Sequence, residues 1–413
     1  MPLTKIENDA LGNTVTATVA SFAIGANVSI NSSAVFFGNS TINTVMTASS
    51  LINANFSINS SAVFVGNSTI NTVMSATGLS IANTFGTSSN TTNLLENRAG
   101  QLFFNGRRVR NINPYAAVYG YAMGGSSGAV VATTDRITFS TGATAAYTAA
   151  NLSQARNLLA GCSDTTVYGY ALGGYSTNYA TTTDRVTFAT STTVAWTAAN
   201  ISLARNYFQG LSDGAVYGYA LGGWSSAVFA TTDRITFSTS STAAYTAGNV
   251  SSARSDTINV SDGSTYGYVC GGYTTAIFAN SDRVTFSTGA SAAYTAANLS
   301  QGRSDGAGLS DGSVYGYVLG GNSGAVVATT DRITFSTSVT AAYTAANLSQ
   351  ARWSAGASAS DGSVYGYVLG GNSGAASSTA DRTTFSTGAT AAYTAANLSQ
   401  ARFGTAGLSD GAV

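Results

Sequence analysis

The sequence predicts an all-β protein whose main body is a six-bladed β-propeller. Three observations support this: a motif rich in tyrosine and glycine recurs six times, the same strand-like segments follow each copy, and the chain ends on a strand that the first copy lacks. The motif reads VYGYVLGG at residues 314–321, and its glycine pairs are spaced 49, 49, 49, 49 and 50 residues apart, at 124/125, 173/174, 222/223, 271/272, 320/321 and 370/371. A unit of about fifty residues with four short strands cannot bury its own apolar face, so the copies must pack on one another.

The fifth copy illustrates the first two strands expected in each unit. Residues 314–319 are rich in Tyr and Val and bounded by glycine, which is typical of a strand that ends at the glycine pair. In residues 331–336, Ile333 and Phe335 share one face and polar side chains share the other. This alternation predicts a half-buried strand.

The remaining part of the unit predicts two more strands. A short turn leads to a third segment at residues 341–344, and a variable stretch after Arg352 ends in Asp361-Gly362, a strong hairpin signal. Four antiparallel strands repeated radially describe propeller blades. Residues 105–114 do not follow the pattern, whereas residues 402–411 do, so the C-terminal strand should complete the first blade and leave no long open edge.

These units resemble the Kelch repeat. That family pairs a strand ending in Gly-Gly with a strand ending in an aromatic, followed by a second aromatic and an arginine that opens the next unit. The matching residues here are Gly320-Gly321, Phe335, Tyr343 and Arg352, with equivalents in all six copies. Phe replaces the usual Tyr, and residues 345–347 replace the Met-Pro common in that family. The resemblance implies a Kelch-like six-bladed fold.

Composition excludes several functions. The sequence contains no histidine, which removes Ser-His-Asp and Cys-His catalysis and histidine-ligated metals. Charged residues make up 8% of the chain, with 17 of each sign, so we expect no nucleic-acid partner and no anionic membrane surface. No apolar run is long enough to predict membrane insertion. Cys162 and Cys270 occupy non-equivalent positions and are expected to be free and buried.

The N-terminal quarter carries a different repeat. Residues 27–46 return at 55–74 with two changes, which gives a period of 28. Two units with short alternating strands bury little surface alone, so we expect them to associate as a β-rich stalk, most simply a homotrimer; a loosely ordered Asn/Ser/Thr linker is the alternative. The predicted organisation is an attachment segment (1–24), the stalk (25–84), a neck (85–113) and the propeller (114–413).

Several features of this quarter resemble bacteriophage tail-fibre and other virion-appendage proteins. They are the opening residues 1–6 (MPLTKI), the Asn-Ser-Thr repeats and the segment 100–110, whose Asn-Gly predicts a hairpin. The resemblance implies a structural protein of the virion, in its tail or capsid, with other virion proteins at one end and a host-binding head at the other. The head's partner would be a host-surface glycan or protein.

Differences between the repeats indicate where a ligand could bind. The positions after each glycine pair and after each second arginine vary while the rest stays fixed, and in Kelch-like propellers these loops open on one face around the central channel. After removal of the two arginines and two aspartates of each unit, only Asp256 and Asp305 remain as extra charges. Aromatic faces with a few carboxylates suit sugar recognition, although drift in exposed loops would give the same divergence. The candidate ligand-binding residues are Tyr175, Trp224, Tyr273, Tyr207, Asp256, Asp305 and Trp353.

Three functions follow from this sequence. The first is a non-enzymatic virion appendage whose propeller binds a host receptor, with no cofactor, metal or catalytic residue. The second is a structural decoration or spacer without a ligand. The third is a glycan depolymerase with Asp256 and Asp305 as acid and base, which requires two separated carboxyls of different proton affinity. The repeated Asp and Arg residues of each unit are expected to hold the blades together.

Overall fold

A computed structural model describes residues 117–353 and 357–410, together with the backbone of nine short strands between residues 28 and 108. The predicted attachment segment, residues 1–24, lies outside the described residues. The chain divides into two units, residues 1–112 and 113–413, which are described separately.

The first unit contains short strands whose pairing follows the 28-residue repeat. β1 and β3 are parallel and place Val28 opposite Phe56; β2 and β4 are also parallel and place Ala34 opposite Ala62. Each copy is therefore paired in register with the next. β1 and β3 form a sheet of their own, β5 and β6 extend the β2–β4 pair to four strands, and β7, β8 and β9 form a third sheet. The strands are β1 Val28–Ile30, β2 Ala34–Phe37, β3 Phe56–Ile58, β4 Ala62–Asn67, β5 Ile70–Ser75, β6 Gly78–Ile81, β7 Leu95–Arg98, β8 Gln101–Phe104 and β9 Arg107–Arg108.

The hairpin predicted for residues 100–110 falls on β8 and β9, which pair antiparallel. Its Asn-Gly turn lies outside the described residues. Formation of a homotrimer stays a prediction.

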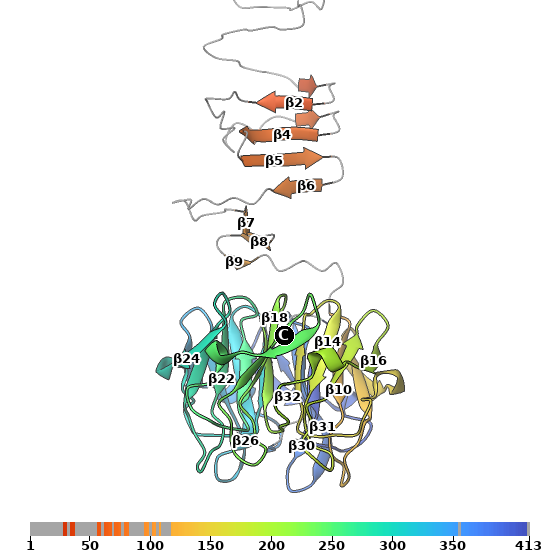
Figure 1. The fold of residues 1–413 in the computed structure, drawn as a ribbon, viewed down its shortest axis with the longest axis vertical. Helices are drawn as coiled ribbons and strands as arrows, with labels where there is room; N and C mark the ends of the chain where they lie inside the picture. Colours follow the sequence, from red (N-terminus) through yellow and green to blue (C-terminus); the bar gives the residue numbers. More distant parts are fainter. Residues whose placement is uncertain are drawn as a thin grey trace, which may run out of the picture. The chain divides into compact units, whose positions relative to one another are not determined.

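The second unit is an all-β, six-bladed propeller (Figure 1). Each blade is an antiparallel four-stranded sheet, and strands follow one another in chain order from the channel outward in five of the six. Blade two comprises β13 Ala160–Ser163, β14 Tyr168–Leu172, β15 Thr183–Thr187 and β16 Thr192–Ala195, and blade three comprises β17 Gln209–Ser212, β18 Tyr217–Leu221, β19 Thr232–Thr236 and β20 Ser241–Ala244. Blade four comprises β21 Ile258–Ser261, β22 Tyr266–Cys270, β23 Ser281–Thr285 and β24 Ala290–Ala293, and blade five comprises β25 Ala307–Ser310, β26 Tyr315–Asn322, β27 Val326–Thr334 and β28 Val339–Ala342. Blade six comprises β29 Ser358–Ser360, β30 Tyr365–Asn372, β31 Ala376–Thr384 and β32 Ala389–Ala392.

The first blade is built from both ends of this unit. Its strands are β10 Tyr119–Met123, β11 Thr134–Thr138, β12 Ala143–Ala146 and, innermost, β33 Ala406–Ser409. β33 pairs antiparallel with β10 and places Ser409 opposite Gly120. The predicted closure by the C-terminal strand is confirmed.

A single 3₁₀ turn follows the outer strand of every blade. Its last residue is buried, and the asparagine after it accepts a hydrogen bond from the backbone of the third strand, as Asn151 does from Thr134 N at 2.9 Å. The six turns are η2 Thr148–Ala150, η3 Thr197–Ala199, η4 Thr246–Gly248, η5 Thr295–Ala297, η6 Thr344–Ala346 and η7 Thr394–Ala396.

The glycine pairs do not end every strand, contrary to the sequence prediction. β26 and β30 continue through the glycines, with a register shift at Leu319/Gly321 in β26, and pair again beyond them. Asn322 is the physical reason in the fifth blade, because its Oδ1 accepts a hydrogen bond from Gly324 N at 2.9 Å and closes a tight turn.

The core lies between adjacent blades. In blade after blade a tyrosine of the second strand stacks on a phenylalanine of the next blade, as Tyr121 does on Phe188 with ring centroids 6.0 Å apart. The equivalent tyrosines are fully buried in all six blades: Tyr121, Tyr170, Tyr219, Tyr268, Tyr317 and Tyr367. Cys162 and Cys270 are free and buried, as predicted.

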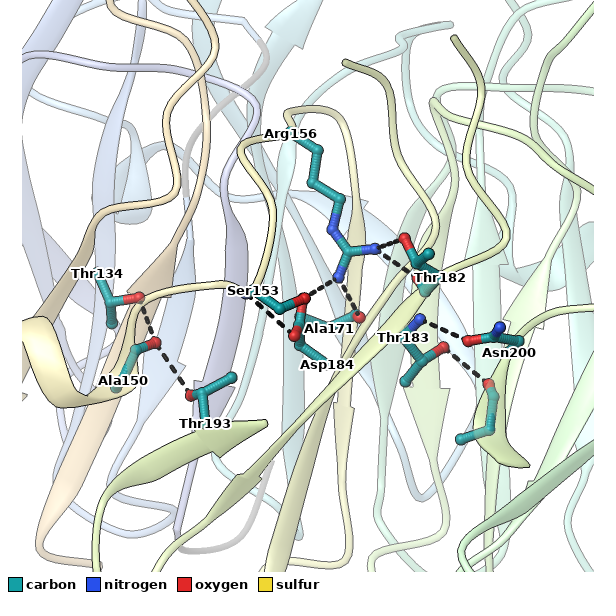
Figure 2. Close-up of polar contacts among 11 residues, drawn as sticks. Thr134, Ala150, Ser153, Arg156, Ala171, Thr182, Thr183, Asp184, Thr193 and Asn200 are labelled. Carbon is teal, nitrogen blue, oxygen red and sulfur yellow. Dashed lines mark hydrogen bonds and ion pairs between the residues drawn. The ribbon is translucent and has the colours of Figure 1, made fainter. Parts of the chain in front are cut away.

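The repeated charges hold the blades together, as predicted. Figure 2 shows one instance: Arg156 donates to Asp184 at 2.6 Å and to the Ala171 carbonyl at 3.1 Å, and both charged side chains are fully buried. The ion pairs are Arg156–Asp184, Arg205–Asp233, Arg254–Asp282, Arg303–Asp331, Arg352–Asp381 and Arg402–Asp135.

The other arginine and aspartate of each unit have equally regular partners. Arg136 lies between the rings of Tyr119 and Tyr147, 3.9 and 3.8 Å from their centroids, and each other blade has such a stack. The turn aspartates accept backbone N–H groups. Asp410 accepts from Val118 N at 2.7 Å and Tyr119 N at 2.9 Å, so it joins the two ends of the propeller.

Candidate functional site

The two variable zones of each repeat lie side by side at one end of the channel. In each blade the residue after the glycine pair bridges the residue after a buried arginine, as Tyr175 does with Asn157 and Trp224 with Asn206. The remaining bridges are Ser126 with Phe403, Ser255 with Tyr273, Ser304 with Asn322 and Trp353 with Asn372. The variation between repeats is therefore gathered on one face of the propeller.

A ring of backbone hydrogen bonds defines the channel mouth at this face. In the five blades where the structure describes it, the second residue after the buried arginine adopts a left-handed backbone conformation with φ between +52° and +65°. Its N–H donates to the carbonyl of its counterpart in the preceding blade, as from Asp256 N to Tyr207 O at 2.7 Å and from Asp305 N to Asp256 O at 2.9 Å. The described members of this mouth ring are Leu158, Tyr207, Asp256, Asp305 and Gly404.

Asp256 and Asp305 occupy neighbouring positions of the mouth ring on adjacent blades and line the same cavity, close enough for the charge of Asp256 to act on Asp305. Ser255 Oγ also donates to Asp256 Oδ2 at 2.6 Å, whereas Asp256 Oδ1 receives no N–H or O–H donor. Burial raises the pKa of Asp256 to about 6, against the opposing effect of Ser255 and Asp305. Burial, and then the charge of Asp256, raise the pKa of Asp305 well above its ordinary value.

Tyr207 is the aromatic group of this mouth. Burial, followed by the charges of Asp305 and Asp256, raises the pKa of its phenol to about 12, so the group is a neutral hydrogen-bond donor. Tyr179 also contributes to this shift and stacks edge-on against Tyr175 with centroids 5.3 Å apart. The structure thus brings Tyr175, Tyr207 and both aspartates of the predicted set onto one arc.

The other predicted residues lie on the same face, with weaker links to the aspartates. Trp353 packs against Phe403 with centroids 6.0 Å apart, on the blades beyond Asp305. Tyr273 is 39% exposed and bridges the residue beside Asp256, and Trp224 bridges the residue beside Tyr207. All seven candidates belong to the mouth face, and their role in binding stays a prediction.

Below the mouth ring, polar side chains cross the channel. Gln209 Nε2 donates to Gly306 O at 3.1 Å, two blades away, and its Oε1 accepts from Asn259 N at 3.0 Å. Asn259 Nδ2 donates to Gln209 O at 3.1 Å, whereas Asn259 Oδ1 has no partner. A cavity of about 130 Å³ occupies this end of the channel, and Tyr207, both aspartates, Gln209 and Asn259 are among the residues that line it.

The narrow channel depends on glycine at the positions that face its axis. A Cβ on Gly210 would lie 2.0 Å from Gly161 O, and one on Gly308 would lie 2.0 Å from Asn259 O. At the far end, serine hydroxyls bridge the strands, as Ser212 Oγ does to Ser163 O at 2.7 Å. The channel is thus tied by hydrogen bonds at both ends.

Charge counting isolates the two aspartates. Residues 114–413 contain twelve arginines and fourteen aspartates and no other ionisable side chain of either sign at neutral pH. Six arginines form the buried ion pairs and six lie between aromatic rings. Every arginine is therefore engaged elsewhere, and Asp256 and Asp305 account for the formal excess of two acidic residues over basic ones.

Sequence reasoning missed three residues of this site: Tyr179, Gln209 and Asn259. A position-by-position comparison of the repeats would have found the last two, because Gln209 occupies a place held by Ala160, Ala307 and Ala406, and Asn259 a place held mostly by glycine. Tyr179 takes the place of Val130, Val228 and Ile277 in the bridges of other blades.

No protein-family model and no curated protein sequence matches this chain. Among the described residues, no helix is long and apolar enough to cross a membrane. The same residues contain no cluster of three or more His, Cys, Asp or Glu side chains that could hold a metal ion.

Proposed function

We propose that the propeller is a recognition head that binds a host-surface glycan at its mouth face. The observation behind this proposal is the break in sixfold symmetry at that face. Ion pairs, stacked arginines and closing bonds repeat from blade to blade, whereas the mouth carries Tyr175, Tyr179 and Tyr207 beside two carboxyls that form no ion pair with an arginine.

The chemistry of this arc suits a sugar. Aromatic faces pack on the apolar faces of pyranose rings, and the Tyr207 phenol and the aspartates offer a donor and acceptors for hydroxyls. The cavity of about 130 Å³ is smaller than the roughly 300–1,000 Å³ of enclosed small-molecule pockets, so a glycan would lie across the face rather than inside the channel.

We also propose that the chain is a virion appendage, in a tail or capsid, with a Kelch-like propeller as its distal part. This proposal rests on the resemblance of the N-terminal quarter to virion-appendage proteins and of the repeats to Kelch units. The direction of the chain within the propeller adds to it. β10 runs from Asp410's turn toward the glycine pair, so the chain enters the propeller at the end opposite to the mouth face.

The enzymatic alternative fits the geometry less well. Glycoside hydrolases hold their carboxyls roughly 5–10 Å apart so that a sugar bond or a water fits between them. Asp256 and Asp305 instead occupy neighbouring positions of the mouth ring, and burial raises the pKa of both carboxyls. A spacer without ligand remains the second candidate, and binding measurements separate it from the first.

The test compares adsorption of purified full-length protein to host cells and to their isolated envelope polysaccharide. Replacing Tyr175, Trp224 and Tyr273 by alanine should reduce binding at least about tenfold, the loss expected for contact aromatics. The matched control replaces three exposed valines at the opposite end of the blades, Val167, Val314 and Val364, by alanine and should bind normally. Equal adsorption of both triple variants and the unmodified protein would favour the spacer.

A further inference from the structure

The interfaces between neighbouring blades are of two kinds, which differ in the residue at one turn. The turn between the third and fourth strands of each blade ends on a residue in the left-handed conformation, serine in blades two, three and five and glycine in blades one, four and six. Where this residue is serine, its hydroxyl forms a hydrogen bond of 2.7–2.8 Å with the buried tyrosine phenol of the preceding blade. The three pairs are Tyr121–Ser191, Tyr170–Ser240 and Tyr268–Ser338.

Glycine at this turn position leaves the phenol of the preceding blade without that partner. The hydroxyls of Tyr219, Tyr317 and Tyr367, all within the described part of the chain, are buried and form no hydrogen bond across the interface. A buried hydroxyl that loses its partner destabilises the folded state, because the hydrogen bonds it made to water are not replaced. The three glycine interfaces are therefore weaker at this point.

A second hydrogen bond divides the interfaces in the same way. At the serine interfaces, a threonine of the fourth strand donates to the carbonyl at the end of the 3₁₀ turn of the preceding blade, at 3.0 Å in each case. The three bonds are Thr193–Ala150, Thr242–Ala199 and Thr340–Ala297. The equivalent hydroxyls at the glycine interfaces, all described by the structure, do not make it: those of Thr144 and Ser291 are buried without a partner, and that of Thr390 bonds to Thr383 in its own blade.

The glycine interfaces have a substitute bond, and it is longest beside blade six. The tyrosine before the 3₁₀ turn donates to a carbonyl of the next blade's turn, at 2.7 Å from Tyr245 between blades three and four. On the two sides of blade six the same bond measures 3.2 Å from Tyr343 and 3.4 Å from Tyr393. All three bonds are exposed, so water competes for them.

Blade six is the one blade with a glycine interface on both sides. Gly388 faces blade five, and Gly142 of blade one faces blade six. Blade two is its opposite, because Ser191 bonds to blade one and the Tyr170 phenol of blade two bonds to Ser240 of blade three. The weakest links of the ring thus enclose a single blade.

The interior of blade six is weaker as well. Ala380 takes the place of a threonine or serine whose hydroxyl donates to the 3₁₀ turn in the other five blades, as Thr330 does to Ala346 O at 2.8 Å. Thr383 is fully buried where the other blades carry Ile or Val. Ala359 replaces larger core residues and lines a cavity of about 30 Å³ between the inner strands of blades five, six and one. Smaller and more polar core residues reduce the stability of a sheet.

From the two interfaces and the core we propose that blade six is a conformational unit that opens on its own while blades one to five stay closed. Folded proteins open in cooperative units of different stability, and here a whole four-stranded sheet has the fewest bonds to its neighbours. The chain on either side is held by other blades, through β28 in blade five and β33 in blade one. Opening separates Asn372 from Trp353, so the state of blade six controls the position of this aromatic on the mouth face.

The experiment is amide hydrogen exchange of the full chain, followed by mass spectrometry. Residues 310–325 of blade five and 360–375 of blade six have the same sequence, so a difference in their protection arises from their surroundings. Peptides that extend to Leu309 or to Ala359 distinguish the two copies. We expect exchange at least about tenfold faster in β30 than in β26, and the slowest exchange in blade two.

The decisive variant is Gly142→Ser/Gly388→Ser, which gives both interfaces of blade six the residue that blades two, three and five carry at this turn. A Cβ at these positions lies 2.8 Å from the side chain of Tyr393 or Tyr343, and both half-exposed rings can turn aside. The new hydroxyls should bond to Tyr317 and Tyr367 and slow exchange in blade six at least about fivefold, with blade two unchanged.

The matched control is Gly289→Ser, which makes the same change between blades three and four and should leave exchange in blade six unaltered. The converse variant, Ser191→Gly/Ser240→Gly, removes both phenol bonds of blade two and should speed its exchange at least about fivefold. Equal protection of β26 and β30 in the unmodified protein would overturn the proposal. So would a double serine variant that protects blade six no more than Gly289→Ser does.

Discussion

Removal of the Arg402 guanidinium tests how the ring is closed. Arg402 forms an ion pair with Asp135 at 2.7 Å and donates hydrogen bonds to Ala122 O at 2.9 Å and to Thr133 Oγ1 at 2.6 Å, and it thereby joins the last residues of the propeller to its first blade. Arg402→Met keeps an apolar chain of similar length and leaves the Asp135 carboxylate, which is 1% exposed, without its cation. Breaking one partner of a buried ion pair costs about 3–5 kcal/mol, so we expect a loss of that size.

The assay is equilibrium urea denaturation of the full chain, followed by tyrosine and tryptophan fluorescence, with the slope m checked for constancy. Arg205→Met is the matched control, because the Arg205–Asp233 pair at 2.6 Å lies within one continuous blade. In a closed ring both variants should lose about the same stability. The double change Arg402→Met/Asp135→Leu should recover most of it, since an apolar pair can replace a buried ion pair at little cost. A loss below about 1 kcal/mol for Arg402→Met, or a double variant as unstable as the single one, would refute the reasoning.

Three further predictions address the channel, the closure and the core. Gly308→Ala places a methyl 2.0 Å from Asn259 O and should cost about 1–3 kcal/mol in the same assay, more than Ser358→Gly at the equivalent place in the next blade; equal costs would contradict the close approach. Asp410→Ala removes the acceptor of Val118 N and Tyr119 N, so their amide hydrogen exchange should accelerate, whereas Asp311→Ala should leave these two amides protected. Burial raises the pKa of Cys270 to about 12 and that of Cys162 further, so neither thiol should react with a disulfide reagent at pH 8 until denaturant is added; reaction of the folded protein would show that blades open.

The blades and their closure could be predicted because they follow from local patterns repeated at a fixed spacing. The alternation around Ile333 places that residue in the core, and the tail from Arg402 to Asp410 matches the strand that the first copy lacks. The extent of β26 and β30 could not be predicted in the same way. It depends on a turn in which Asn322 and Asn372 accept from a glycine two residues later, whereas most other blades carry a bulky aromatic at that place.

The site was only partly predictable, for a different physical reason. Divergence between repeats identified the face, and charge counting identified Asp256 and Asp305. Their contact depends on the radius of the channel, which is set by glycines such as Gly210 and Gly308 on separate blades. The sequence of one repeat does not determine that radius, because the close approach involves residues of separate blades. Gln209 and Asn259 were missed because they lie one layer deeper, inside a strand that otherwise appears purely structural.

The mouth ring explains how one face can vary while six blades stay alike. Each link of the ring joins a backbone N–H to a backbone carbonyl, so Leu158, Tyr207 and Asp256 occupy the same place without a change in the bonds that close the channel. The left-handed conformation costs a residue with a Cβ roughly 1–2 kcal/mol, least for aspartate, and glycine, as at Gly404, would avoid it. Leucine and tyrosine at such positions bring strain that folding does not require. If the proposed ligand contacts are what keeps these side chains in place, replacing Leu158 or Tyr207 by glycine should relieve the backbone strain and leave the bonds of the ring intact.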